Sequence, residues 1–141
     1  MKKKITLVTG CAGFIGSNLV DKLLDKKYIV YGIDNFRTGH LKNLKKAFKH
    51  KNFHFIKLDL LKKNKLKKIF KKKIDIVFHF AANADVKNGY FNPSNDLKYN
   101  TLVTFNILEE MREKKIKNIV FCSTGSIYGE TKEIPTPENT N

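Results

Sequence analysis

The sequence of 141 residues has little of the features that mark secreted and membrane proteins. Its two cysteines, Cys11 and Cys122, are too few for a disulfide framework, so we expect buried, reduced thiols in a cytoplasmic protein. No apolar run approaches the roughly 20 residues that span a bilayer, which predicts no membrane partner. A hydrophobic content of 41% argues against disorder and indicates one domain with a real core.

Arginine is also scarce, although the formal net charge is +15. The lysine-rich run KKNKLKKIFKKK at residues 62–73 is compatible with nucleic-acid binding. Proteins that read nucleic acids rely on arginine, however, and only Arg37 and Arg112 are present. Apolar residues also recur in and beside this run at the spacing of an amphipathic helix, namely Leu61, Leu66, Ile69 and Phe70. We therefore predict a solvated lysine face and no nucleic-acid partner.

The N-terminal stretch MKKKITLVTGCAGFIG allows two interpretations, an export signal or a strand that leads into a phosphate-binding loop. Only six residues, two of them threonine, separate Lys4 from Cys11, whereas a signal peptide needs an apolar core of roughly 7–15 residues. Gly10, Gly13 and Gly16 instead follow a β-rich run and precede apolar residues at helical spacing. This pattern predicts a strand, a glycine turn and a helix whose N-terminus binds a pyrophosphate.

An acidic residue strengthens the prediction of a dinucleotide site. The apolar run Tyr28–Ile33 predicts a second strand that ends at Asp34, 18 residues after Gly16. A carboxylate at this spacing typically accepts hydrogen bonds from the adenosine ribose hydroxyls, and it would repel a 2′-phosphate. NAD is therefore favoured over NADP, although the nearby Arg37 weakens this preference. The alternative is that Asp34 only forms a turn at the end of the strand.

Strands and helices alternate along the whole chain. Three further strands are expected at Phe53–Leu58, Ile74–Phe80 and Asn118–Cys122. Helices are expected at Phe14–Lys27, Leu41–His50, Leu61–Lys72 and Leu97–Lys115, with a loop at Asn88–Asn95. This alternation predicts a doubly wound parallel α/β sheet, in which ligands bind at the carboxyl ends of the strands. The four histidines lack metal-ligand spacing, so we expect no metal site and place them in solvent or loop positions.

Together these residues resemble the extended short-chain dehydrogenase/reductase family, and within it the sugar-nucleotide epimerases of the UDP-glucose 4-epimerase group. The matching motifs are T-G-x-x-G-F-I-G (Thr9–Gly16), I-D-N-F-x-T-G (Ile33–Gly39), D-L (Asp59 and Leu60), F-H-F-A-A-N-A-D-V (Phe78–Val86), N-T-x-x-T-x-N-I-L-E (Asn100–Glu109) and S-T-G-S-I-Y-G (Ser123–Gly129). The resemblance implies a Rossmann-like sheet of five strands with flanking helices. It also implies NAD as the cofactor and a UDP-sugar as the substrate of the full-length enzyme.

The resemblance also implies site residues. The pyrophosphate would be held by Gly10, Gly13, Phe14, Ile15 and Gly16. The adenosine would be held by Asp34 and Asn35 at the ribose and by Asp59 and Leu60 at the adenine. The rest of the cofactor would lie over Phe80, Ala81 and Ala82 and near Asn100, and Thr124 would place its hydroxyl against the reacting 4-hydroxyl of the sugar. For the two alanines and Asn100, simple packing and a tie to a buried loop remain open as alternatives.

The sequence departs from this family at one essential motif. The family's catalytic Tyr-x-x-x-Lys pair should begin about 25 residues after Thr124, and residues 1–141 do not contain it; Tyr128 and Lys132 match the spacing only formally. We therefore expect an incomplete NAD-binding domain without its substrate domain, inactive by itself and prone to form a homodimer. The alternatives are a sugar-nucleotide 4,6-dehydratase, which Gly125 and Ser126 argue against, and a non-catalytic dinucleotide-binding module.

Overall fold

A five-stranded parallel sheet forms the centre of the protein, as predicted. The computed structural model describes residues 3–139. The strands are β1 (Ile5–Thr9), β2 (Ile29–Asp34), β3 (Phe53–Lys57), β4 (Ile76–His79) and β5 (Ile119–Phe121), and their order in the sheet is β3-β2-β1-β4-β5. The order reverses between β1 and β4, so the carboxyl ends of these two neighbours open at the point where such sheets bind ligands.

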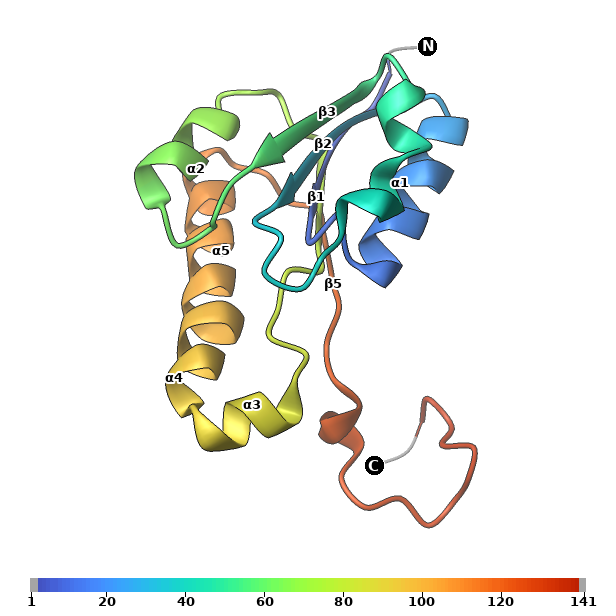
Figure 1. The fold of residues 1–141 in the computed structure, drawn as a ribbon, viewed down its shortest axis with the longest axis vertical. Helices are drawn as coiled ribbons and strands as arrows, with labels where there is room; N and C mark the ends of the chain where they lie inside the picture. The colour runs from blue at the N-terminus through green and yellow to red at the C-terminus, as the bar shows by residue number, and fades with distance from the viewer. Residues whose placement is uncertain (1–2, 140–141) are drawn as a thin grey trace.

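Helices cover both faces of the sheet, which explains why adjacent residues of its central strands are apolar and buried. Figure 1 shows α1 (Phe14–Asp25) on one face, with α2 (Lys63–Ile69) and α5 (Val103–Glu113) on the other. Leu7 and Val8 of β1 point to opposite faces, and each is fully buried in a separate core cluster. The two clusters fix β1 and β4, and with them the start of the loops that follow these strands.

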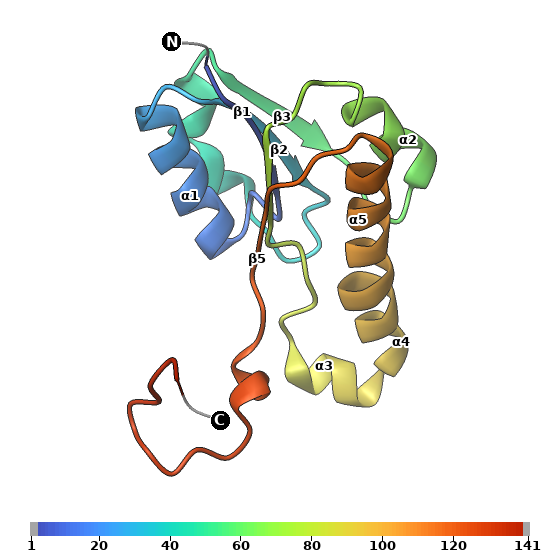
Figure 2. The same cartoon turned by 180° about the vertical axis from the view of Figure 1, so that it is seen from behind.

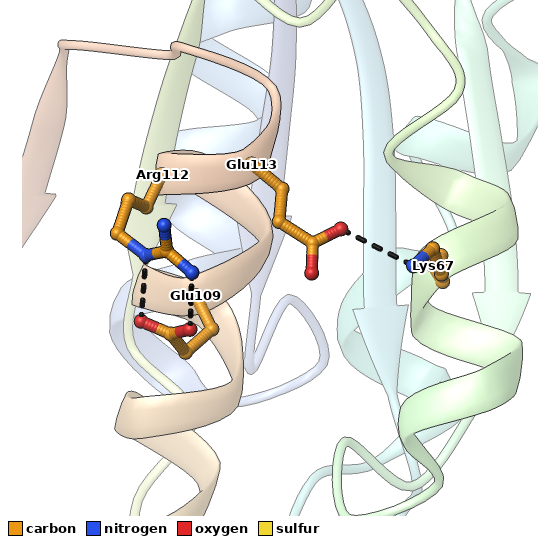
Figure 3. Close-up of polar contacts among 4 residues, drawn as sticks. All are labelled: Lys67, Glu109, Arg112 and Glu113. Carbon is orange, nitrogen blue, oxygen red and sulfur yellow. Dashed lines mark hydrogen bonds and ion pairs between the residues drawn. The ribbon is translucent and has the colours of Figure 1, made fainter.

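Two ion pairs lie on the outside of α5, and one of them connects it with α2. Figure 3 shows Lys67 of α2 reaching Glu113 of α5, with 3.2 Å between the amine and the carboxylate. Within α5, Arg112 donates two hydrogen bonds to Glu109, at 3.1 and 2.9 Å, and this pairing lowers the pKa of Glu109. All four side chains reach solvent, so the pairs orient the helices and contribute little to stability.

Two of the predicted connections were wrong. The expected loop Asn88–Asn95 contains α3 (Val86–Phe91) and α4 (Pro93–Asp96), because Asp85 caps the first helix and Pro93 begins the second. The expected helix Leu41–His50 consists of two short 3₁₀ turns, Leu41–Leu44 and Ala47–Lys49. Here Asn43 donates its amide to the Ala12 carbonyl at 2.8 Å, which ties the segment to the glycine loop.

β5 is one of the two edge strands of the sheet, and the chain after it leaves the body of the domain. Figures 1 and 2 show this segment running away from the carboxyl end of the sheet. Val120 and Phe121 are 42% and 54% exposed, and Cys122 is exposed as well, so the expectation of two buried thiols was wrong for Cys122. Within residues 3–139, no helix is both long and apolar enough to cross a membrane.

Candidate functional site

The glycine loop lies between β1 and α1, and its backbone requires glycine at two positions. Gly10 has φ +66°, and a Cβ there would lie 2.8 Å from the Ala81 nitrogen. A Cβ on Gly16 would collide with the Gly10 carbonyl oxygen, so α1 can begin this close to β1 only with glycine at that position. Both restrictions keep the N-terminal end of α1 close to the end of β1, which is the arrangement that binds a pyrophosphate in dinucleotide sites.

Asp34, at the end of β2, is directed toward this loop. Its Oδ2 accepts the Ala12 N–H at 2.9 Å, and its Oδ1 accepts the Phe36 N–H at 2.8 Å. The residue is only 8% exposed. Each carboxylate oxygen has a second lone pair, so Asp34 can hold the loop and still accept hydrogen bonds from a ribose. The turn role that was left open for Asp34 is therefore compatible with the ligand role.

Cys11 lies buried inside the same loop. Burial raises the pKa of its thiol far above the ordinary range, and the nearby Asp34 carboxylate raises it further. The thiol therefore stays protonated and unreactive at neutral pH. Cys11 fills space beneath the loop, where its sulfur lies close to Gly32 of β2.

An open cleft runs along the carboxyl ends of β1 to β4. Its volume is about 600 Å³ when the open, solvent-filled space in front of it is counted. Nine of the thirteen residues predicted to bind the cofactor line it: Gly10, Gly13, Asp34, Asn35, Asp59, Leu60, Phe80, Ala81 and Ala82. In the wall after β3, Asp59 accepts the Leu61 N–H at 3.0 Å and lies 3.5 Å from the Asn35 amide nitrogen. The cleft thus brings together groups that are up to 72 residues apart in the chain.

Four predicted cofactor residues do not line this cleft. The side chains of Phe14 and Ile15 are exposed at the start of α1, and Gly16 is buried against Gly10. Asn100 instead accepts the Asn83 N–H at 2.6 Å and donates to the Asn83 carbonyl at 3.3 Å. These bonds correspond to the loop tie that the sequence left open for Asn100.

Thr124, predicted to contact the sugar, follows the carboxyl end of β5 and does not line the cleft. It is exposed, and its hydroxyl accepts the Ser126 N–H at 3.2 Å at the start of a 3₁₀ turn, Gly125–Tyr128. The chain then turns at Gly129, which has φ +59°. Lys132 therefore does not lie one helical turn beyond Tyr128, in agreement with a purely formal match to Tyr-x-x-x-Lys.

Sequence reasoning placed Arg37 near Asp34 but missed its partners. Arg37 lies at the cleft, with its guanidinium 4.0 Å from the centre of the Tyr99 ring and Nη1 3.4 Å from Asn83 Oδ1. It is thus engaged with neighbouring side chains. His79 was expected in solvent or in a loop, but it is buried on β4 between the hydroxyls of Thr9 and Thr104. The apolar residues around His79 indicated a strand correctly. The error was to expect a histidine side chain to be exposed there.

Comparisons with known proteins agree with this geometry. The model of the NAD dependent epimerase/dehydratase family matches residues 6–141. A UDP-glucose 4-epimerase of Mycolicibacterium smegmatis is 36% identical over 135 residues, which are 95% of this chain and 43% of that protein. A UDP-glucuronic acid decarboxylase of Danio rerio is 33% identical over 97% of this chain and 31% of its own length.

Solved structures extend this likeness to three dimensions. The structure of UDP-glucose 4-epimerase from Thermus thermophilus, in complex with NAD, superposes with a TM-score of 0.85 at 38% identity. The match covers 96% of this chain and 43% of that one. The chain therefore spans less than half the length of the relatives it matches.

Proposed function

The chain belongs to the NAD-dependent epimerase/dehydratase family, and on this premise we propose that it is the NAD-binding part of a UDP-sugar 4-epimerase. The observation that carries the proposal is the single cleft at the carboxyl ends of β1 to β4, where most of the predicted cofactor residues meet. NAD is the cofactor of the family, and glycine at positions 10 and 16 lets the start of α1 pack close to the end of β1, which supports a pyrophosphate site there.

Each wall of the cleft has its own task in this proposal. The start of α1, at Phe14, Ile15 and Gly16, holds the pyrophosphate together with the turn at Gly10 and Gly13. Asp34 and Asn35 hold the adenosine ribose, and the buried carboxylate disfavours a 2′-phosphate. The Asp59 carboxylate accepts a hydrogen bond from the adenine amine, with Leu60 packed beside the ring.

The reacting end of the site lies over β4 and β5. The small side chains of Ala81 and Ala82 leave room for the cofactor, and Asn100 keeps the loop after β4 in place through Asn83. Thr124 is positioned at the same edge of the sheet, where its hydroxyl can hydrogen-bond the 4-hydroxyl of the sugar. Bound NAD would supply reversible hydride transfer at C4 of the sugar.

The general base and the substrate domain are not assigned within residues 1–141. The phenolate that removes the proton of the 4-hydroxyl needs a lysine nearby to lower its pKa. No tyrosine of the chain lies four residues before a lysine on a helix among the residues that the structure describes. We therefore propose that residues 1–141 form an incomplete domain that binds NAD and does not turn over UDP-sugars by itself.

Gly125 and Ser126 distinguish epimerisation from elimination. A 4,6-dehydratase uses an Asp-Glu pair directly after the threonine that corresponds to Thr124, because it must add and remove protons at the sugar. This chain has Gly125 and Ser126 there. The epimerase proposal is preferred for this reason.

Calorimetric titration of the purified chain with NAD and with NADP tests the proposal. We expect NAD to bind more tightly than NADP, and we expect tightly bound NAD to be released when the purified protein is denatured. A chain that binds neither dinucleotide contradicts the proposal. If the same chain then binds a polyanion such as heparin with high affinity, the lysine surface acquires the functional role instead.

A further inference from the structure

His79 is buried on β4 and forms two hydrogen bonds whose directions can be worked out. Its Nδ1 lies 2.6 Å from the Thr9 hydroxyl, and its Nε2 lies 3.0 Å from the Thr104 hydroxyl. Thr9 belongs to β1 and Thr104 to α5, so the imidazole connects the two strands at the ligand edge with the helix above them. It is 1% exposed, and its ring is stacked on Phe121 of β5.

The Thr104 side fixes the proton on Nε2. The Thr104 hydroxyl donates to the Asn100 carbonyl at 2.6 Å, and a carbonyl oxygen can only accept. The single proton of that hydroxyl is therefore used, and Thr104 can only accept from His79. Nε2 must carry a hydrogen to donate.

The Thr9 side gives the same answer independently. The Thr9 hydroxyl oxygen accepts the Ala81 N–H at 3.2 Å and also the Phe80 N–H at 3.2 Å, which is shared with the Thr9 carbonyl at the same distance. Both of its lone pairs are then occupied, and its own proton is free to be donated. His79 Nδ1 must accept that proton, so it carries none. A second proton on the ring would place an N–H against an oxygen with no lone pair left.

Phe80 and Ala81 are among the residues that line the cleft. Their amides are held by a hydroxyl that is itself oriented by His79. We propose that His79, as the neutral imidazole with its proton on Nε2, is a positioning residue that fixes the Phe80–Ala82 backbone for the cofactor. The part of this inference that concerns the cofactor rests on the proposed function; the hydrogen-bond order does not.

Burial explains why the ring stays neutral. Its hydrogen-bond partners are the hydroxyls of Thr9 and Thr104, and its stacking partner is the ring of Phe121. None of these groups carries a charge at neutral pH. Desolvation lowers the pKa of His79 to about 4. The neutral form is therefore the only one populated at neutral pH, as the hydrogen-bond order requires.

Long-range ¹H–¹⁵N spectra of the histidine rings at pH 7 test the order directly. The spectrum of His79→Asn identifies the His79 signals by their loss. We expect a protonated Nε2 and an unprotonated Nδ1. A ring protonated on Nδ1, or on both nitrogens, overturns the proposal, whether or not the chain binds NAD.

Variants test the positioning role against a purely structural one. Thr9→Val removes the acceptor of the Ala81 amide and leaves the Phe80 amide its second acceptor, the Thr9 carbonyl. Thr6→Val removes an equally buried hydroxyl of β1 that donates to the Ile29 carbonyl at 3.3 Å. We expect Thr9→Val to accelerate hydrogen exchange at Ala81 and to weaken NAD binding about tenfold, which corresponds to about 1.4 kcal/mol. Thr6→Val should do neither.

The choice of substitution at His79 adds a rescue test. Asparagine places an oxygen where Nδ1 stood and can accept from Thr9, whereas leucine cannot. His79→Asn should therefore retain slow exchange at Ala81 and stronger NAD binding than His79→Leu. Equal exchange rates in the two variants, or equal effects of Thr9→Val and Thr6→Val, overturn the proposal. If the unmutated chain binds no NAD, the proposed function fails, and the exchange rates and ring spectra still decide on His79.

Discussion

The carboxylate of Asp34 accepts the backbone N–H of Ala12 at 2.9 Å, so the end of β2 is tied directly to the glycine loop after β1. The same carboxylate accepts the Phe36 N–H through its other oxygen. Sequence spacing alone assigned Asp34 to the ribose, but the structure gives it a second task. It shapes the loop that is proposed to hold the pyrophosphate, so one residue couples two parts of the cofactor site.

Asp34→Asn should weaken NAD binding by roughly tenfold or more, because a hydrogen bond to a charged group contributes about 1.5–3 kcal/mol. Asparagine has one acceptor oxygen and cannot serve both Ala12 and Phe36. The preference for NAD over NADP should narrow as the negative charge disappears. Titration calorimetry with both dinucleotides measures the two effects.

Asp75→Asn is the matched control for this variant. Asp75 accepts the Ile5 N–H at 2.7 Å, also at a strand end, but at the amino ends of β1 and β4, on the other side of the sheet from the cleft. It should leave NAD affinity unchanged. Equal losses in the two variants, or tighter binding of NADP by the unmutated chain, would contradict the assignment of Asp34.

The centre of the sheet was predictable from the sequence because β1 is buried on both faces and carries adjacent apolar residues, as at Leu7 and Val8. The cleft was predictable because parallel strands bring their carboxyl ends together. The partners of His79 and Asn100 were not, since they come from β1, α5 and the loop after β4. No local pattern reports such contacts. The helix α3 could have been found from Asp85, whose side chain accepts the Asn88 N–H at its start.

Lowering the pH should destabilise the fold through His79. Its pKa is about 4 in the folded protein against an ordinary value of 6.5, so the unfolded chain takes up a proton that the folded one refuses. The stability that depends on the neutral ring is complete above pH 6.5 and is lost as the pH falls toward 4, by about 3 kcal/mol in total. Urea unfolding between pH 4.5 and 7.5 measures the slope.

Two variants isolate this contribution from that of the carboxylates. His79→Leu has no ring to protonate, so its stability should depend less on pH over this range, even though it is lower at pH 7.5. His54→Leu removes an exposed ring that stacks on Tyr31 and should keep the full slope. If the stability of His79→Leu depends on pH as strongly as that of the unmutated chain, His79 is not the source of the pH dependence.

Glu110 should be a source of instability on α5. Both of its carboxylate oxygens are buried, and neither has a hydrogen-bond partner among the residues that the structure describes. Glu110→Met should therefore raise the free energy of unfolding by about 1–3 kcal/mol, since burying an unpaired polar group costs about this much. Glu113→Met, on the same helix, removes only the exposed ion pair with Lys67 and should change stability by less than about 1 kcal/mol. A lower melting temperature for Glu110→Met would show that the carboxylate has a partner.

The purified chain should not interconvert UDP-glucose and UDP-galactose. A positioned general base contributes about 10²–10⁴-fold to such a reaction, and Tyr128 lies in a 3₁₀ turn that ends before Gly129 reverses the chain. A coupled assay with added NAD measures turnover, with Tyr128→Phe as the companion variant. Conversion by the unmutated chain that disappears in Tyr128→Phe would assign the base to Tyr128 after all.

The outer face of the helical segment 97–113 should cause the chain to associate. Leu97, Phe105 and Leu108 are each about half exposed, while Val103 and Met111 face the sheet. Segment 97–113 therefore carries more apolar residues than the side packed on the sheet can bury. An exposed apolar stripe of this kind usually finds a partner.

Net charge opposes this association, and salt should reveal the balance. The +15 charge repels a second copy, but repulsion is screened beyond about 8 Å at physiological ionic strength. We therefore expect light scattering to show a homodimer or larger species that grows with salt concentration. The double variant Phe105→Ser and Leu108→Ser should remain monomeric. Val86→Ser, which removes a still more exposed apolar side chain from α3, should associate like the unmutated chain. A monomer at every ionic strength and at high concentration would show that the stripe on segment 97–113 does not drive self-association.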